Sequence, residues 1–448
     1  MSGNAIAFGI YVTSAAEHSP DKGLVIGIAI AALTATALLN MLSSRVAIIF
    51  NNVFAAIKVA LLLAIIVLGF MKAGGFKFSE KVAEKATSNF DTATSFNPGA
   101  SAASGVSTSL VYIIYTYSGF EQPFYVLTEI RKPRKLFPKW TLMAMALVVT
   151  LFLHVNVAYF CAVPWDLPAL DEQRNMATVF FGQIFGDDNR AARRAMDSII
   201  AFSIFGNLLV MTYTASRVKQ EIAKEGILPW SLTFATSHRT PLALWFSRYQ
   251  TGTTPEEAPM AALGLHWFMS VMLIGVTAML SPPTAYSALV TLYSYVIVIL
   301  LGFFTSAGLL YLKFKKSRNW TNPNFNPKFG SVYAAVYAVM CCFMLFAAFA
   351  PPSDTSPYSY AASKIKWFVL PAIGLTTPFW GVLWYLGLRL VMVKRGRKLV
   401  VERVPTTRLV KGEKDQYIMI SETIEHNWPI YGEEAGASDV ELNDRAGR

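Results

Sequence analysis

Long apolar stretches separated by short polar segments fill the first 393 residues of the chain. A transmembrane helix needs about 20 mostly apolar residues to cross roughly 30 Å of hydrocarbon. The stretches of this length are 23–44, 47–71, 105–128, 140–163, 196–216, 260–281, 285–312, 330–351 and 366–393. The pattern predicts an all-α polytopic membrane protein with about nine full spans in residues 17–393.

The two ends of the chain differ from this pattern. Residues 1–16 are apolar but too short to cross a bilayer, and they lack the basic start and the small-residue cleavage site of a signal peptide. We expect them to form a partial transmembrane span. Residues 394–448 are polar, and we expect a tail that is disordered apart from Gln416–Ile420. The sequence is compatible with an inert tail and with a regulatory one.

Charged residues are concentrated in that tail, which holds ten basic and ten acidic residues of the 39 and 28 in the whole chain. The other residues are therefore only about 12% charged, against roughly 25% in soluble domains. This composition excludes a soluble enzyme, a nucleic-acid-binding protein and a disordered scaffold. The formal net charge of +11 lies between the apolar stretches, because the tail itself is neutral.

Basic residues follow every second predicted span, and this alternation predicts the orientation. Lys and Arg near span ends favour the cytoplasmic side. We therefore expect the tail to be cytoplasmic, and the loops 73–104 and 164–195, the second with five acidic residues, to face the other side. The residues in question are Arg131, Lys132, Arg134, Lys135, Lys139, Arg217, Lys219, Lys224, Lys313, Lys315, Lys316, Arg318, Lys394, Arg395, Arg397 and Lys398, and, in the acidic loop, Asp166, Asp171, Glu172, Asp187 and Asp188.

The predicted span 105–128 contains a potential helix break, Tyr115-Thr116-Tyr117-Ser118-Gly119-Phe120-Glu121-Gln122-Pro123. Pro123 has no N–H, so the carbonyl of Gly119 should lose its helical partner, and glycine tolerates unwound backbone. Broken helices survive in a membrane where they line a cavity, and their two ends favour a cation and an anion. A zwitterion such as a free amino acid offers both charges. A kink packed by neighbouring helices is the alternative.

Lys58 lies eleven residues into the predicted span 47–71, near the bilayer centre. A lysine at that depth costs about 2.5–3.5 kcal/mol on insertion scales, so we expect it to face a polar interior. Glu121 could contact substrate or a proton path, or face an inner vestibule. Ser203 and Asn207 are candidate cavity-lining groups, with interhelical hydrogen bonding as the alternative. The sequence shows no metal-ligand spacing, cofactor motif or catalytic constellation, so an enzyme is not expected.

Several segments resemble a known transporter superfamily. YTYSGFEQPFYVLTEIRKPRKLFPK (Tyr115–Lys139) resembles the sixth-span region of the amino acid–polyamine–organocation superfamily, NNVFAAIKVALLL (Asn51–Leu63) its fifth span, and SRVKQEIAKEGILPW (Ser216–Trp230) the loop after its eighth. With GLHWFMSV (Gly264–Val271) and SAGLLYLKF (Ser306–Phe314), the pattern is similar to the fungal methionine permeases of the L-type amino acid transporter group.

The resemblance implies a five-plus-five inverted repeat within twelve spans, of which this chain would hold part of the third to the twelfth. It places the unwound sixth-span segment on Tyr117, Ser118, Gly119 and Phe120, an aromatic gate on Tyr115, and, on Lys58, a lysine that stands where other carriers hold sodium. The glycine-rich break of the family's first span is absent from the sequence, and so is the second span. We therefore expect the chain alone to show little saturable uptake.

The function expected from these observations is secondary active transport of a neutral L-amino acid by alternating access, with methionine as the expected substrate and protons as possible coupling ions. The partners would be the amino acid and the lipid bilayer, with no nucleic acid and no cofactor; an accessory subunit stays unassigned. The expected location is the plasma membrane. The alternatives are a non-transporting amino acid sensor of the same fold and an inactive truncated fragment. A membrane-embedded enzyme is disfavoured by the missing catalytic residues.

Overall fold

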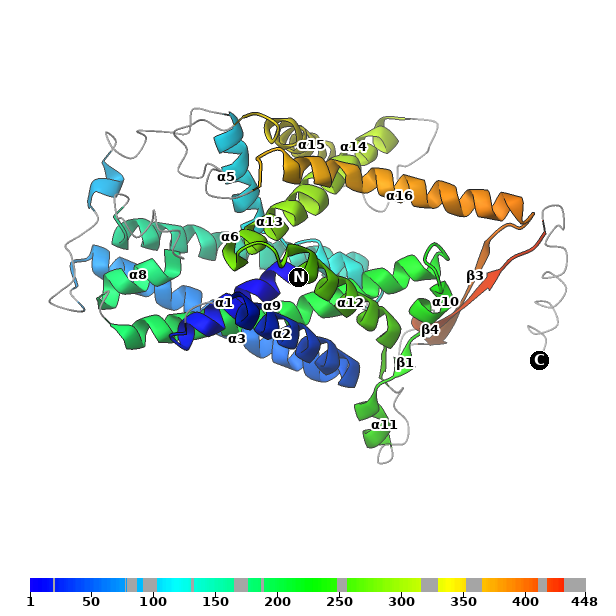
Figure 1. Ribbon diagram of the computed structural model, residues 1–448, viewed down its shortest axis with the longest axis horizontal. Coiled ribbons are helices and arrows are strands. Elements are labelled where there is room, and N and C mark those ends of the chain that lie inside the picture. Colours follow the sequence, from blue (N-terminus) through cyan, green and yellow to red (C-terminus); the bar gives the residue numbers. More distant parts are fainter. Residues whose placement is uncertain are drawn as a thin grey trace. The chain divides into compact units, whose positions relative to one another are not determined.

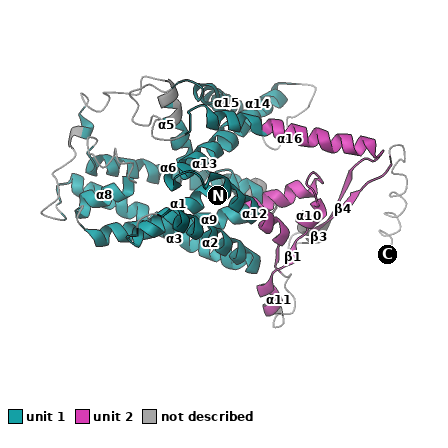
Figure 2. Ribbon diagram, viewed as in Figure 1, with its two compact units in different colours: residues 1–214, 267–377 teal, residues 215–266, 378–448 magenta. Residues whose placement is uncertain are grey.

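A computed structural model describes residues 1–18, 21–76, 78, 87–91, 103–129, 133–164, 176–186, 189–247, 256–315, 329–351, 365–409 and 417–430. The chain divides into two compact units (Figure 2). Unit 1 comprises residues 1–214 and 267–377, and unit 2 comprises residues 215–266 and 378–448. Several charged loop residues used for the orientation lie outside the described residues: Arg131, Lys132, Asp166, Asp171, Glu172, Asp187, Asp188, Lys316 and Arg318.

Eight helices among the described residues are long and apolar enough to cross a membrane. Many of their apolar side chains are exposed, as expected for helices whose outer faces meet lipid rather than water. In chain order they are α2 (Lys22–Leu42), α3 (Ser44–Ala73), α6 (Pro133–Ala162), α9 (Arg190–Lys224), α12 (Met260–Thr277), the continuous run α13 (Pro282–Tyr293), η3 (Ser294–Leu300) and α14 (Leu301–Phe314), α15 (Gly330–Ala347) and α16 (Val369–Lys394) (Figure 1).

The remaining helices are shorter. The predicted span 105–128 is not one helix, because α5 ends and a 3-10 helix, η2, begins after a five-residue turn. The N-terminal apolar segment forms a single helix of 14 residues, α1. These elements are α1 (Ser2–Ala15), η1 (Thr87–Phe90), α5 (Ala103–Thr116), η2 (Gln122–Glu129), α8 (Met176–Phe185), α10 (Ser231–Ala235) and α11 (Pro241–Ser247).

Small residues allow close helix packing in the core of unit 1. α1 packs along α2, and a Cβ added at Gly9 would lie 2.5 Å from the carbonyl oxygen of Val25. α3 packs along α6, and a Cβ at Gly69 would lie 2.4 Å from that of Ala158. In a membrane, helices associate by such close packing because lipid removes most of the hydrophobic drive between them.

Unit 2 contains two β-hairpins beside its helical segments. The short strands β1 (His238–Arg239) and β2 (Glu257–Ala258) pair antiparallel, and so do β3 (Val400–Leu409) and β4 (Tyr417–Asn427). The expectation of a disordered tail is therefore wrong for β3 and for residues 421–427 of β4, whereas residues 417–420 belong to the stretch for which the sequence predicts order. Their β-branched side chains favour strands, and contacts with other parts of unit 2, such as that of β4 with α10, add to this preference.

Candidate functional site

The helix break lies at the residues where the sequence predicts it. α5 ends at Thr116, residues 117–121 form a turn, and η2 begins at Gln122. Gly119, in the middle of the turn, has a φ of +105°, which only glycine adopts without strain. The chain is thus unwound at the centre of its broken span.

Glu121 holds the two sides of the break together. Its carboxylate accepts a hydrogen bond from the backbone N–H of Gly119 at 3.0 Å and one from the side-chain amide of Gln122 at 3.2 Å. The hydroxyl of Tyr293, at the end of α13, donates to the same carboxylate at 2.7 Å. Three donors stabilise a carboxylate that would otherwise be costly in the membrane interior.

The sequence predicts that the Gly119 carbonyl loses its hydrogen-bond partner, and the structure differs on this point. The Gly119 carbonyl keeps a partner, because it accepts a hydrogen bond from the N–H of Gln122 at 3.1 Å. The turn continues into a 3-10 helix, in which the N–H of residue i+3 donates to the carbonyl of residue i. Because Pro123 has no N–H, the carbonyl that loses its hydrogen-bond donor is that of Phe120. No hydrogen bond to the carbonyls of Thr116, Tyr117 or Phe120 is found among the described residues.

Tyr115 connects the break to α1. Its hydroxyl donates to the side-chain oxygen of Asn4 at 2.8 Å and also interacts with Tyr286 of α13. Its ring meets that of Tyr293 edge to face, with the ring centroids 6.4 Å apart. The last turn of α5 is therefore fixed by residues from two other helices of unit 1.

The other candidate residues of the break lie around this centre. The Ser118 hydroxyl donates to the carbonyl of Tyr115 at 2.6 Å, which closes the end of α5. The ring of Tyr117 packs against Phe152 of α6, with centroids 5.4 Å apart, and Phe120 is exposed. The amide of Gln122 is also the acceptor for the Thr214 hydroxyl of α9.

The structure does not bring Lys58 into this network. Lys58 is half-buried on α3, one helical turn after Phe54, whose ring packs against Phe202 of α9 with centroids 4.2 Å apart. On α9, Ser203 is half-buried and Asn207 is exposed. No hydrogen bond or ion pair joins Lys58, Ser203 or Asn207 to the residues of the break within the described part of unit 1.

Sequence reasoning missed Asn4, Tyr286, Tyr293 and Thr214. Tyr286 and Tyr293 are seven residues apart, so they share one face of a helix, and this spacing could have indicated a polar face directed at the interior. Nothing in the sequence indicates which helix that face meets. Among the described residues, no group of three His, Cys, Asp or Glu side chains is placed to hold a metal ion.

Comparison with known proteins shows the family of the chain. A model of the amino acid permease family matches residues 1–375, which is most of the chain. The chain belongs to the amino acid permease family. Together with its long apolar helices, this makes it an integral membrane protein of a transporter family rather than an enzyme.

The relatives of this chain share modest identity with it. The high-affinity methionine permease of Saccharomyces cerevisiae is 25% identical over 358 residues, which are 79% of this chain and 56% of the yeast protein. The human b(0,+)-type amino acid transporter 1 is 24% identical over 220 residues, 49% of this chain and 42% of its own length. The chain thus spans little more than half the length of the yeast protein and less of the human one.

Proposed function

We propose that this permease transports neutral L-amino acids, methionine among them, across the plasma membrane by alternating access. The proposed binding site is the break between α5 and η2, formed by Tyr115 and residues 117–121. The family match and the two relatives named for amino acid transport support the class of substrate. The geometry of the break supports the place where it binds.

The observation that most supports this binding site is the negative polarity of the break. The freed N–H of Gly119 is already used by Glu121, whereas carbonyls of the turn keep accepting capacity. A carboxylate next to unpaired carbonyls at the end of a helix favours a cation. The break is therefore suited to the ammonium group of an amino acid, and the donors for the substrate carboxylate must lie outside it.

The aromatic residues of the break suit an apolar side chain. Tyr115 lies just before the turn, Tyr117 is its first residue, and Phe120 is exposed within it. Aromatic rings make favourable contacts with a thioether sulfur, worth roughly 0.3–1.5 kcal/mol each. We propose that this contact favours methionine over polar amino acids.

Lys58 is proposed as a fixed or proton-coupled cation of the transport cycle. A half-buried lysine on a membrane-spanning helix has no solvent to stabilise its charge, and function is the default explanation for such a residue. Its charge would replace that of a sodium ion, so uptake should not require sodium.

The tail is proposed to lie in the cytoplasm. In unit 2 the tail hairpin contacts the end of α9, and this contact supports placing the tail on the same side of the membrane as the segment after the predicted span 196–216. Both segments carry the basic residues typical of the cytoplasmic side.

Uptake of radiolabelled L-methionine into proteoliposomes tests the proposal. In a protein extended at its N-terminus by the missing glycine-rich span, we expect saturable uptake that unlabelled neutral L-amino acids inhibit and that replacing sodium by choline does not change. The chain of 448 residues alone should show little saturable uptake. Glutamate and lysine at the same concentration should inhibit little. Saturable methionine binding without uptake would instead indicate a sensor of the same fold. The absence of both binding and uptake would refute the proposal.

A further inference from the structure

The end of α9 carries a cluster of charged side chains that transport at the break does not use. Glu221 and Lys224 lie in the last turn of α9, Glu225 follows the helix, and Gly226 turns the chain with a φ of +71°. Arg217 and Lys219 precede these three charged residues, so the end of the helix is not negative as a whole. The two carboxylates of Glu221 and Glu225 nevertheless outnumber the one ammonium group beside them, and they can pair with a segment that brings a cation.

The tail hairpin presents such a segment on one of its two faces. Along β3, Val401 and Arg403 are less exposed than Val400, Glu402 and Val404. Along β4, Glu422, Ile424 and His426 are less exposed than Thr423, Glu425 and Asn427. Alternate residues of a strand point to the same face, and Arg403 pairs with Ile424 across the ladder. The hairpin thus has one face that packs inward, and it carries a cation and an anion.

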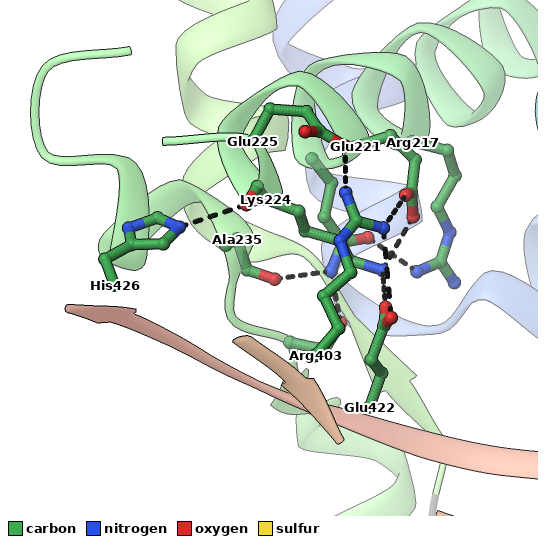
Figure 3. Close-up of polar contacts among 10 residues, drawn as sticks. Arg217, Glu221, Lys224, Glu225, Ala235, Arg403, Glu422 and His426 are labelled. Atoms are coloured by element: carbon green, nitrogen blue, oxygen red, sulfur yellow. Dashed lines mark hydrogen bonds and ion pairs between the residues drawn. The ribbon is translucent and has the colours of Figure 1, made fainter. Parts of the chain in front are cut away.

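Ion pairs join this face to the end of α9 (Figure 3). Lys224 lies 2.9 Å from Glu422 of β4 and 2.6 Å from Glu221 of its own helix. Arg403 of β3 pairs with Glu225, and its guanidinium lies 3.7 Å from Glu221 and 3.8 Å from Glu422. Three acidic and two basic groups from segments far apart in the chain thus form one network.

Burial shows which pair matters most. The side chains of Lys224 and Glu422 are only 12% and 14% exposed, whereas Glu225 is 58% exposed. Exposed ion pairs contribute little, but breaking a largely buried pair leaves an uncompensated charge. The Lys224–Glu422 pair, with Arg403 beside it, therefore dominates the attachment of the hairpin.

Neutral contacts complete the attachment. The imidazole of His426 donates to the carbonyl of Lys224 at 3.0 Å, which satisfies one of the last carbonyls of α9. Leu399, just before β3, lies so close to Gly226 that a Cβ there would be 2.7 Å from its side chain. The short helix α10 also contacts β4.

We propose that the end of α9 is a docking surface for the C-terminal hairpin, and that the charge network of Lys224, Arg403 and Glu422 holds the tail there. A two-stranded hairpin is marginally stable by itself in water, so β3 and β4 depend on this surface for their order. The partner of the surface is a segment of this chain, and the tail is an attached element rather than a free one. The proposal does not depend on which substrate is carried.

Carbodiimide cross-linking tests the contact in the parent protein. The reagent joins an amine to a carboxylate only when they already touch, so we expect an amide bond between Lys224 and Glu422, found by mass spectrometry of the digested protein in proteoliposomes. Glu422→Gln removes the reacting group and gives the background. A parent yield no higher than this background would overturn the proposal.

Hydrogen exchange of the strand amides tests the role of the charges. In Arg403→Gln we expect residues 400–404 and 422–427 to exchange roughly tenfold or more faster than in the parent, because the undocked hairpin opens. Arg403→Lys keeps the charge and should retain most of the protection. Arg395→Gln, the same change outside the network, should match the parent. Parent-like protection in Arg403→Gln, or parent strands that exchange as fast as unstructured chain, would contradict the proposal.

Discussion

Replacing Gly119 by alanine tests whether the unwound backbone matters for substrate. Gly119 has a φ of +105°, and a Cβ added there would lie 3.8 Å from the nearest atom, in the Gln122 side chain. This is an ordinary contact, so the methyl group has room. The whole effect of Gly119→Ala must therefore come from the backbone conformation.

The magnitude follows from the strain. A non-glycine residue in such a sparsely populated region costs about 1–3 kcal/mol. If the chain relaxes by leaving the unwound conformation, the binding-competent fraction falls by the same free energy. Because each 1.4 kcal/mol is a factor of ten, apparent affinity for methionine should fall roughly 5- to 150-fold.

The assay combines methionine uptake with thermal unfolding of the purified protein. Gly275→Ala is the matched control, because Gly275 lies in α12 with nothing within 4 Å of an added Cβ, and its uptake should equal that of the parent. A lowered melting temperature with unchanged KM in Gly119→Ala would show that the break is only structural. Unchanged stability and unchanged KM would refute the reasoning about strain altogether.

Three further predictions concern coupling and topology. Lys58→Met keeps the length and removes the charge, so uptake should lose its pH dependence while the protein stays expressed; an unchanged pH profile would reduce Lys58 to a packing residue. Glu121→Gln and Tyr293→Phe remove the two ends of one hydrogen bond, and a double-mutant cycle on thermal stability should give a coupling of about 1.5–3 kcal/mol, whereas additive effects would contradict the contact. Cysteines placed at Ser95 and Ser438 should react with an impermeant reagent from opposite faces of the membrane, and equal labelling in intact cells would overturn the topology.

The helices could be predicted from the sequence because an apolar stretch of span length specifies a helix locally. The break could be predicted for the same reason, since Gly119 and Pro123 act on their own backbone. The partners of the break could not. Asn4 is 111 residues from Tyr115, and Tyr293 is 172 residues from Glu121, and only tertiary packing brings them together.

The order in the tail could not be predicted from its composition. Its polar composition indicates disorder, but the strands 400–409 and 417–427 pair along an antiparallel ladder, with one register shift between Thr406 and Thr407. Composition averages over a segment, whereas strand pairing depends on which residues share a face. The inward face of this hairpin carries charges, so its burial could not be recognised by searching for apolar alternation.

Substrate protection of a cysteine at the break tests the central claim most directly. In a variant with Ser118→Cys and the three native cysteines replaced, alkylation of Cys at this position is followed in proteoliposomes with and without L-methionine. The proposed site predicts that saturating L-methionine slows alkylation several-fold, with a half-effect at the KM for uptake, and that glutamate does not. Uptake that persists with an unchanged alkylation rate at saturating methionine would show that the substrate binds elsewhere.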